Sequence, residues 1–141
     1  MWMRPVISLL SLLGLADASY LTFQHYLGSI PPCSVAGCEQ VLTSSYATIA
    51  GVPISLFGVA FYLTLLILSR LKSRQAWLAL IVITSAGVIT SAGLVYLQLA
   101  VIKAICLYCL TSAGITLLIW MLSLIRINHN RTFALSPSLR K

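Results

Sequence analysis

The sequence predicts an all-α membrane protein, built as a four-transmembrane-helix bundle with a periplasmic loop between the first two helices. Three observations lead to this prediction. Hydrophobic residues fill 60% of the 141 positions and charged residues only 8%, whereas soluble domains carry about 25% charged residues. A chain of this length has too little interior to hide so much apolar surface from water. The apolar residues also gather in four runs, and most basic residues lie on one side of these runs.

The four apolar runs cover residues 5–27, 53–69, 77–100 and 104–125. A transmembrane helix needs about 20 apolar residues, within a range of roughly 17–25, so all four runs qualify and the second is at the short end. Because lipid offers the backbone no hydrogen-bond partners, each span must be helical. Pro53 suits the first turn of the second helix, where its missing N–H costs nothing. In the third run, the Ser-Ala-Gly triplets at 85–87 and 91–93 favour close helix packing.

The first run has two interpretations. Arg4, the apolar residues after it and the Ala-Asp-Ala triplet at 16–18 resemble a signal peptide that is cleaved. Apolar residues resume at Tyr20 and extend the run to spanning length, so we expect it to be retained as the first helix. Asp17 inside this span is a functional candidate, for example as a proton relay, although we favour a hydrogen bond to a neighbouring Ser or Thr. His25, near the outer end, is either a proton donor or an interface residue.

The basic residues set the orientation of the bundle. Of the nine lysines and arginines, only Lys103 lies on the same side as the loop between the first two spans. Basic segments stay in the cytoplasm, which places both termini inside and the 28–52 loop and the 102–105 connection outside. This anchoring explains the net charge of +7, so no nucleic-acid partner is expected. Residues 1–127 are predicted to form the membrane domain, and 128–141 a polar, disordered cytoplasmic tail.

The outer loop is the longest segment between predicted spans. Two prolines at 31–32 enforce extended backbone at its start. Residues 39–46 are expected to form a short helix lying on the membrane, with Val41 and Leu42 facing it.

Four cysteines form two pairs that are predicted to reach the same outer face. Cys106 and Cys109 are three residues apart near the start of the fourth helix, which puts them on one helix face and within slight adjustment of disulfide geometry. The helix start favours the thiolate form of the first cysteine. Cys33 and Cys38 enclose a flexible Gly37 in the outer loop, where a disulfide is exposed and open to exchange. The two pairs together indicate a relay of disulfide exchange.

Two other functions remain open at this point. The four cysteines could form a zinc or haem-handling site, or their disulfides could only brace a structural tetraspan. We favour redox exchange and predict no metal site, because a metal cage needs fixed ligands and one pair lies at the edge of the bundle. The outer side of a bacterial inner membrane is also oxidising, so disulfides persist there.

The chain resembles the vitamin K epoxide reductase family, in particular its bacterial members, over about residues 5–125. The matching residues are Cys33-x₄-Cys38, Val41-Leu42-x-Ser44-x-Tyr46, Gly51-x-Pro53, Gly58-x₃-Tyr62 and Cys106-Leu107-Tyr108-Cys109. The resemblance implies that Cys106 and Cys109 are the active pair and that Cys109 meets a quinone in the bundle. It also implies that Cys33 accepts electrons from an outside partner, that Cys38 passes them to Cys106, and that Ser44 lies near the active pair.

The electron acceptor is therefore expected to be a quinone, ubiquinone or menaquinone, in the inner membrane of a bacterium. The donor is expected to be a separate periplasmic thioredoxin-fold thiol oxidase of the DsbA-like kind. A quinone site should be mostly apolar with a few polar groups, and we predict contacts from Tyr46, Phe57, Tyr62, Tyr108 and Thr111, although tyrosines are also common interface anchors. Animal members carry an asparagine and a tyrosine where this chain has Ile54 and Ala113, which favours quinone reduction over epoxide reduction.

Overall fold

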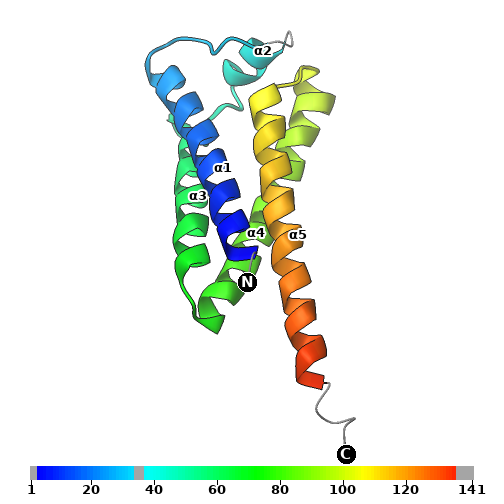
Figure 1. Ribbon diagram of the computed structural model, residues 1–141. Helices are drawn as coiled ribbons and strands as arrows, with labels where there is room; N and C mark the ends of the chain where they lie inside the picture. The colour runs from blue at the N-terminus through cyan, green and yellow to red at the C-terminus, as the bar shows by residue number, and fades with distance from the viewer. Residues whose placement is uncertain (1–2, 34–36, 136–141) are drawn as a thin grey trace, which may run out of the picture.

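The computed structural model describes residues 3–33 and 37–135, with side chains described up to residue 127, and the described chain is mostly helical (Figure 1). The elements in order are helix α1 (Met3–Tyr26), helix α2 (Cys38–Leu42), strand β1 (Thr48–Ile49), strand β2 (Val52–Pro53), helix α3 (Ile54–Arg70), helix α4 (Arg74–Tyr96), the π-helix η1 (Leu97–Ile102) and helix α5 (Leu107–Leu135).

The predicted helical membrane class is confirmed. Within the described residues, three helical segments are long and apolar enough to cross a membrane: α1, the continuous α4–η1 helix and residues Leu107–Ile127 of α5. Helix α3 is also apolar but has only 17 residues, which is the lower limit for a span. The structure therefore contains three or four apolar spans, and the count of four stays a prediction.

The predicted runs fall within a few residues of the observed helices, and the differences have local causes. The 77–100 run is extended because the chain continues through η1 to Ile102. Helix α5 runs to Leu135, past residue 127, where the sequence predicts that the membrane domain ends. No proline or glycine interrupts residues 115–136, so nothing in the backbone stops this helix earlier. Residues 136–141 of the predicted tail lie outside the described residues, and the division at 127 remains a prediction.

The outer loop contains less helix than expected and a small hairpin that the sequence analysis missed. Helix α2 ends at Leu42 instead of reaching residue 46, because the hydroxyls of Thr43 and Ser44 donate to the carbonyls of Glu39 and Val41 and close the last turn. Strands β1 and β2 pair antiparallel around Ala50 and Gly51, which both have positive φ, 53° and 82°, as a tight two-residue hairpin turn requires.

The helices pack as two neighbouring pairs, α1 with α3 and α4 with α5, and α1 also contacts α5 (Figure 1). Figure 1 shows α2, the end of η1 and the start of α5 together at one end of the bundle, while the α3–α4 connection lies at the other. The central core consists of buried side chains from all four long helices: Ile7, Ala18, Tyr62, Leu65, Trp77, Leu80 and Ile119. This packing brings both cysteine-bearing segments to the same end.

Small residues in α4 have the predicted packing role at one of two sites. A Cβ at Gly87 would lie 2.5 Å from Phe61 Cζ and 3.1 Å from Thr116 Cγ2, whereas a Cβ at Gly93 would meet nothing within 4 Å. The Trp120 indole N–H also donates to Ser85 Oγ at 2.9 Å. The triplet at 85–87 therefore brings α3, α4 and α5 together, while Gly93 leaves open space.

We expect Gly87→Val to destabilise the bundle by about 1–3 kcal/mol, because the added side chain overpacks the contact with Phe61. Gly93→Val is the matched control, since it makes the same change in the same helix without meeting a neighbour. Thermal unfolding of both variants in one detergent measures the difference. An equal loss of stability in the two variants would contradict the packing described here.

Candidate active site

The four cysteines come from two segments far apart in the sequence and lie in one packed cluster. Cys38 and Cys106 are buried at its centre with Val41 and Ala104. The partly buried residues packed against them are Cys33, Leu42, Ile102, Tyr108 and Cys109. Cys33 and Cys38 are joined by a disulfide, whereas Cys106 and Cys109 are free thiols. Cys33 is half-buried and Cys38 is only 1% exposed, so of the two bridged sulfurs Cys33 is the one that an outside molecule reaches more easily.

Gly37 lets the outer loop lie directly on the connection between η1 and α5. A Cβ at this position would lie 2.7 Å from the carbonyl oxygen of Ile105 and 2.9 Å from its amide nitrogen. The φ of Gly37 is 169°, an extended value that any residue adopts, so space alone demands a glycine here. The close backbone contact holds Cys38, the next residue, beside the residue before Cys106.

Gln98 in η1 holds the segment that carries Cys106. Its side-chain Oε1 accepts a hydrogen bond from the Cys106 amide at 3.0 Å, and its carbonyl oxygen accepts one from the Ala104 amide at 3.0 Å. Gln98 is only 3% exposed. The sequence analysis missed this residue, although an amide inside an apolar run is a signal that it overlooked. The π-helical turn around Gln98 also fits a functional site.

The free thiols differ in acidity. Cys106 lies in the connection before α5, and a hydrogen bond with the Cys109 thiol lowers its pKa to about 7, although burial acts in the opposite direction. A thiol with a pKa near ambient pH attacks disulfides efficiently, and its stabilised thiolate also leaves readily from a mixed disulfide. Cys106 is thus chemically suited to exchange with Cys38 in either direction.

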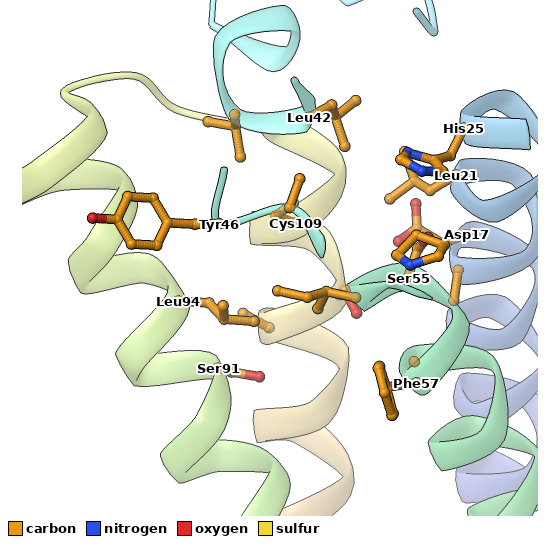
Figure 2. A pocket seen from close by; sticks show the side chains of 18 of the residues that line it. Asp17, Leu21, His25, Leu42, Tyr46, Ser55, Phe57, Ser91, Leu94 and Cys109 are labelled. Carbon is orange, nitrogen blue, oxygen red and sulfur yellow. The ribbon is translucent and has the colours of Figure 1, made fainter. Parts of the chain in front are cut away.

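A cavity of about 890 Å³ lies among the four long helices below α2 (Figure 2). Its volume is in the range of small-molecule sites, roughly 300–1,000 Å³. Five of the predicted site residues line it: Ser44, Tyr46, Phe57, Tyr62 and Cys109. Figure 2 shows Cys109 of α5 at the cavity, with Asp17 and His25 of α1 on one side and Leu94 and Tyr46 on the other. The cavity therefore extends from Cys109 into the interior of the bundle.

Two of the residues predicted to contact a quinone do not line the cavity, and two residues that do line it already donate hydrogen bonds to backbone carbonyls. Tyr108 and Thr111 are not among the lining residues: the Tyr108 hydroxyl donates to the Pro32 carbonyl at 3.0 Å, next to Cys33, and Thr111 donates to the Leu107 carbonyl at 2.9 Å. Tyr62 is buried in the core, and its hydroxyl donates to the Ser112 carbonyl at 2.8 Å. Ser44 Oγ donates to Val41 at the end of α2.

Among residues 3–33 and 37–135, no group of three or more His, Cys, Asp and Glu side chains is placed to hold a metal ion.

Comparison with known proteins gives two findings. The sequence model of the vitamin K epoxide reductase family matches residues 5–124 of this chain. The thiol-disulfide oxidoreductase LTO1 of Arabidopsis thaliana is 32% identical to the chain over 120 residues, which cover 76% of this chain and 32% of the relative. The chain thus spans about a third of the length of this relative.

The acidity of Cys106 can be measured directly. In protein with the Cys33–Cys38 bridge intact and the other pair reduced, we expect the ultraviolet absorbance of a thiolate to appear with a midpoint at about pH 7. The thiol is protonated below this pH and ionised above it. Cys109→Ala removes the hydrogen bond and should move the midpoint upward, and Cys106→Ala should abolish the transition. An unchanged midpoint in Cys109→Ala would contradict the assigned cause.

The contact at Gly37 yields a second prediction. Gly37→Ala should push the outer loop off Ile105 and slow disulfide exchange between Cys38 and Cys106, by up to about 100-fold if the sulfurs move apart by about 1 Å. The rate is followed by mapping disulfides after protein with both pairs oxidised is mixed with a dithiol. Gly114→Ala in α5 is the control, because a Cβ there meets nothing within 4 Å. Equal rates in both variants would show that the close approach has no role in exchange.

Proposed function

The chain belongs to the vitamin K epoxide reductase family, and from this we propose that it is a membrane thiol–quinone oxidoreductase that generates disulfides in proteins outside the cytoplasm. The observation that carries the proposal is the single cluster in which both cysteine pairs meet, above a cavity that Cys109 lines. A purely structural tetraspan would not need two free thiols packed beside a disulfide. The name of the Arabidopsis relative, a thiol-disulfide oxidoreductase, agrees with this activity.

The relay proceeds by two exchanges. A partner dithiol attacks the Cys33 sulfur of the Cys33–Cys38 disulfide, and the partner's second thiol then resolves the mixed disulfide, so the partner is oxidised and Cys33 and Cys38 are reduced. Cys38 next attacks Cys106 in the Cys106–Cys109 disulfide and releases Cys109. Cys33 then attacks Cys38 and releases Cys106, which restores the outer bridge and leaves the inner pair reduced. The acidic Cys106 thiolate is a good leaving group for this last step.

The redox state described here corresponds to the end of this exchange, with Cys33 bridged to Cys38 and the Cys106 and Cys109 thiols free. The pair of thiols then needs an electron acceptor to return to the disulfide. A quinone, ubiquinone or menaquinone, takes up two electrons and two protons when it is reduced. The cavity suits such a flat, apolar molecule, because it is enclosed by membrane helices and lined by Cys109, Phe57 and Tyr46.

Two lining residues support quinone reduction rather than epoxide reduction. Ile54 and Ala113 both line the cavity, at the positions where the resemblance implies an asparagine and a tyrosine in animal members. Neither side chain can donate a hydrogen bond. Tyr108 and Thr111 lie away from the cavity and are not included among the proposed quinone contacts.

The proposed partner is a periplasmic thioredoxin-fold protein of the DsbA-like kind, which would be reoxidised through half-buried Cys33. We place the protein in the inner membrane of a bacterium with four spans, α3 included, both termini in the cytoplasm and both cysteine pairs on the outer face. The distribution of basic residues supports this orientation.

The relay order predicts a trapped intermediate. In Cys109→Ala with the outer bridge intact, the Cys106 thiolate can attack Cys38 and release the Cys33 thiol, so a disulfide between Cys38 and Cys106 should be present in protein kept free of reductant. Proteolysis between the two segments followed by non-reducing electrophoresis detects it as linked fragments, and adding Cys38→Ala should remove the link. Unlinked fragments in Cys109→Ala would contradict the proposed order.

Cys33→Ala and Cys106→Ala should each abolish quinone-dependent oxidation of a reduced thioredoxin-fold donor.

A further inference from the structure

Asp17 carries a carboxyl group that neither the packing nor the thiol relay uses. It lies in α1 and lines the cavity that Cys109 also lines. Its Oδ2 atom is buried and has no hydrogen-bond partner among the described residues. Figure 2 shows Asp17 on the α1 side of this space. Within a membrane, an acidic side chain that faces the bundle interior is a functional candidate.

The hydrogen bond that the sequence analysis favours for Asp17 is not found for Oδ2. The neighbouring hydroxyls have other partners: Thr22 donates to the Ala18 carbonyl at 2.7 Å and lies 3.0 Å from Ser55 Oγ, and Tyr62 donates to Ser112. Buried polar atoms in proteins are nearly always paired. An unpaired oxygen that faces a cavity is therefore a position at which a bound molecule can complete the pairing.

We propose that Asp17 holds a proton and donates it to the quinone oxygen as the quinone is reduced in this cavity, an inference that rests on the function proposed above. An isolated carboxylate is costly in apolar surroundings, whereas the neutral acid is tolerated. The neutral acid also has an O–H group, which is the donor that a quinone oxygen requires.

The proton balance of the reaction requires such a group. At neutral pH about half of the Cys106 side chains are thiolates, because the pKa is about 7, and a pair with Cys106 ionised brings two electrons but only one proton. When Cys106 and Cys109 form their disulfide, the two electrons pass to the quinone, the Cys109 thiol supplies one proton and Asp17 supplies the other. The products are the disulfide, the quinol and the Asp17 carboxylate, and the total charge is unchanged.

On the side of α1 that lines the cavity, the apolar residues Ala18 and Leu21 follow Asp17, and two polar side chains come next towards the outer end. Gln24 and His25 lie about two turns further along the helix and line the same cavity. The other ionisable side chains that line it are His25 of α1, Tyr46 of the outer loop, Tyr62 of α3 and Cys109 of α5, while α4 and η1 contribute none. His25 is the other ionisable side chain that α1 presents to the cavity, and it lies closer to the outer end of the helix.

The test compares the two acidic residues of the chain, Asp17 and Glu39. Asp17→Asn keeps the shape of the side chain but removes the transferable proton, and Asp17→Glu restores an acid. Glu39→Gln is the matched control, because Glu39 is exposed on α2 and does not line the cavity. Pre-reduced protein in lipid nanodiscs is mixed with decylubiquinone, and quinol formation is followed in a single turnover. We expect Asp17→Asn to lose about 100-fold or more in rate, Glu39→Gln to match the wild type, and Asp17→Glu to recover part of the rate.

A second readout does not depend on turnover. Fully oxidised protein cannot reduce decylubiquinone, so an infrared difference spectrum records binding alone. We expect decylubiquinone to shift the carbonyl stretching band of a protonated carboxylic acid in the wild type and in Glu39→Gln, and this band to be missing from Asp17→Asn. This measurement on the wild type keeps the proposal testable even if Asp17→Asn folds poorly.

The outcomes separate the two proposals. If the wild type reduces decylubiquinone and Asp17→Asn does so at the same rate, or if no carboxylic acid band moves on binding, the role of Asp17 is refuted and the thiol–quinone function stands. If the wild type neither binds nor reduces decylubiquinone, the proposed function itself fails. Unchanged trapping of the Cys38–Cys106 disulfide in an Asp17→Asn, Cys109→Ala protein would place the defect after the thiol relay, as we expect.

Discussion

The contact between the outer loop and the connection before α5 is the constraint on which the site depends. Gly37 lies against the backbone of Ile105, and Gln98 fixes the Cys106 amide from the other side. Tyr108 adds a third tie by donating to the carbonyl of Pro32. Together they hold two short, irregular segments in one cluster, where sulfur atoms separated by about half the chain can exchange partners. The long helices serve this contact by bringing both segments to one end of the bundle.

The rest of the bundle shows how a membrane protein satisfies its polar groups. Buried hydroxyls donate to carbonyls of the preceding turn in their own helices, as Ser11, Thr84 and Ser123 do. Others join helices, as in the contact between Ser8 and Ser69. Among the described residues, the buried side-chain atoms without a partner are Oδ2 of Asp17 and the indole nitrogen of Trp77. The Trp77 ring packs under the Arg126 guanidinium at the other end of the bundle, so Asp17 is the exception that faces the cavity.

The sequence was sufficient for features that depend on composition and chain order. Hydropathy predicted the long apolar helices, and the cysteine spacing together with the span pattern predicted that the two pairs meet. Hydropathy and chain order do not predict how a helix is rotated about its own axis. For this reason Tyr108 and Thr111 were expected at the cavity, while Gln98 was overlooked. The same limit applies to Gly37, since its close approach to Ile105 joins segments that no local pattern relates. The hairpin at Ala50 and Gly51 depends on positive φ at an alanine, which residue preferences do not favour.

The proposed electron path runs from an outside dithiol through both cysteine pairs to a quinone. Its most direct test is an anaerobic count of products, with purified protein in nanodiscs, a reduced thioredoxin-fold donor and decylubiquinone. We expect one quinol for each disulfide formed in the donor, over many turnovers. Donor oxidation without a matching yield of quinol, or quinol formation that continues when Cys38 is replaced by alanine, would contradict it.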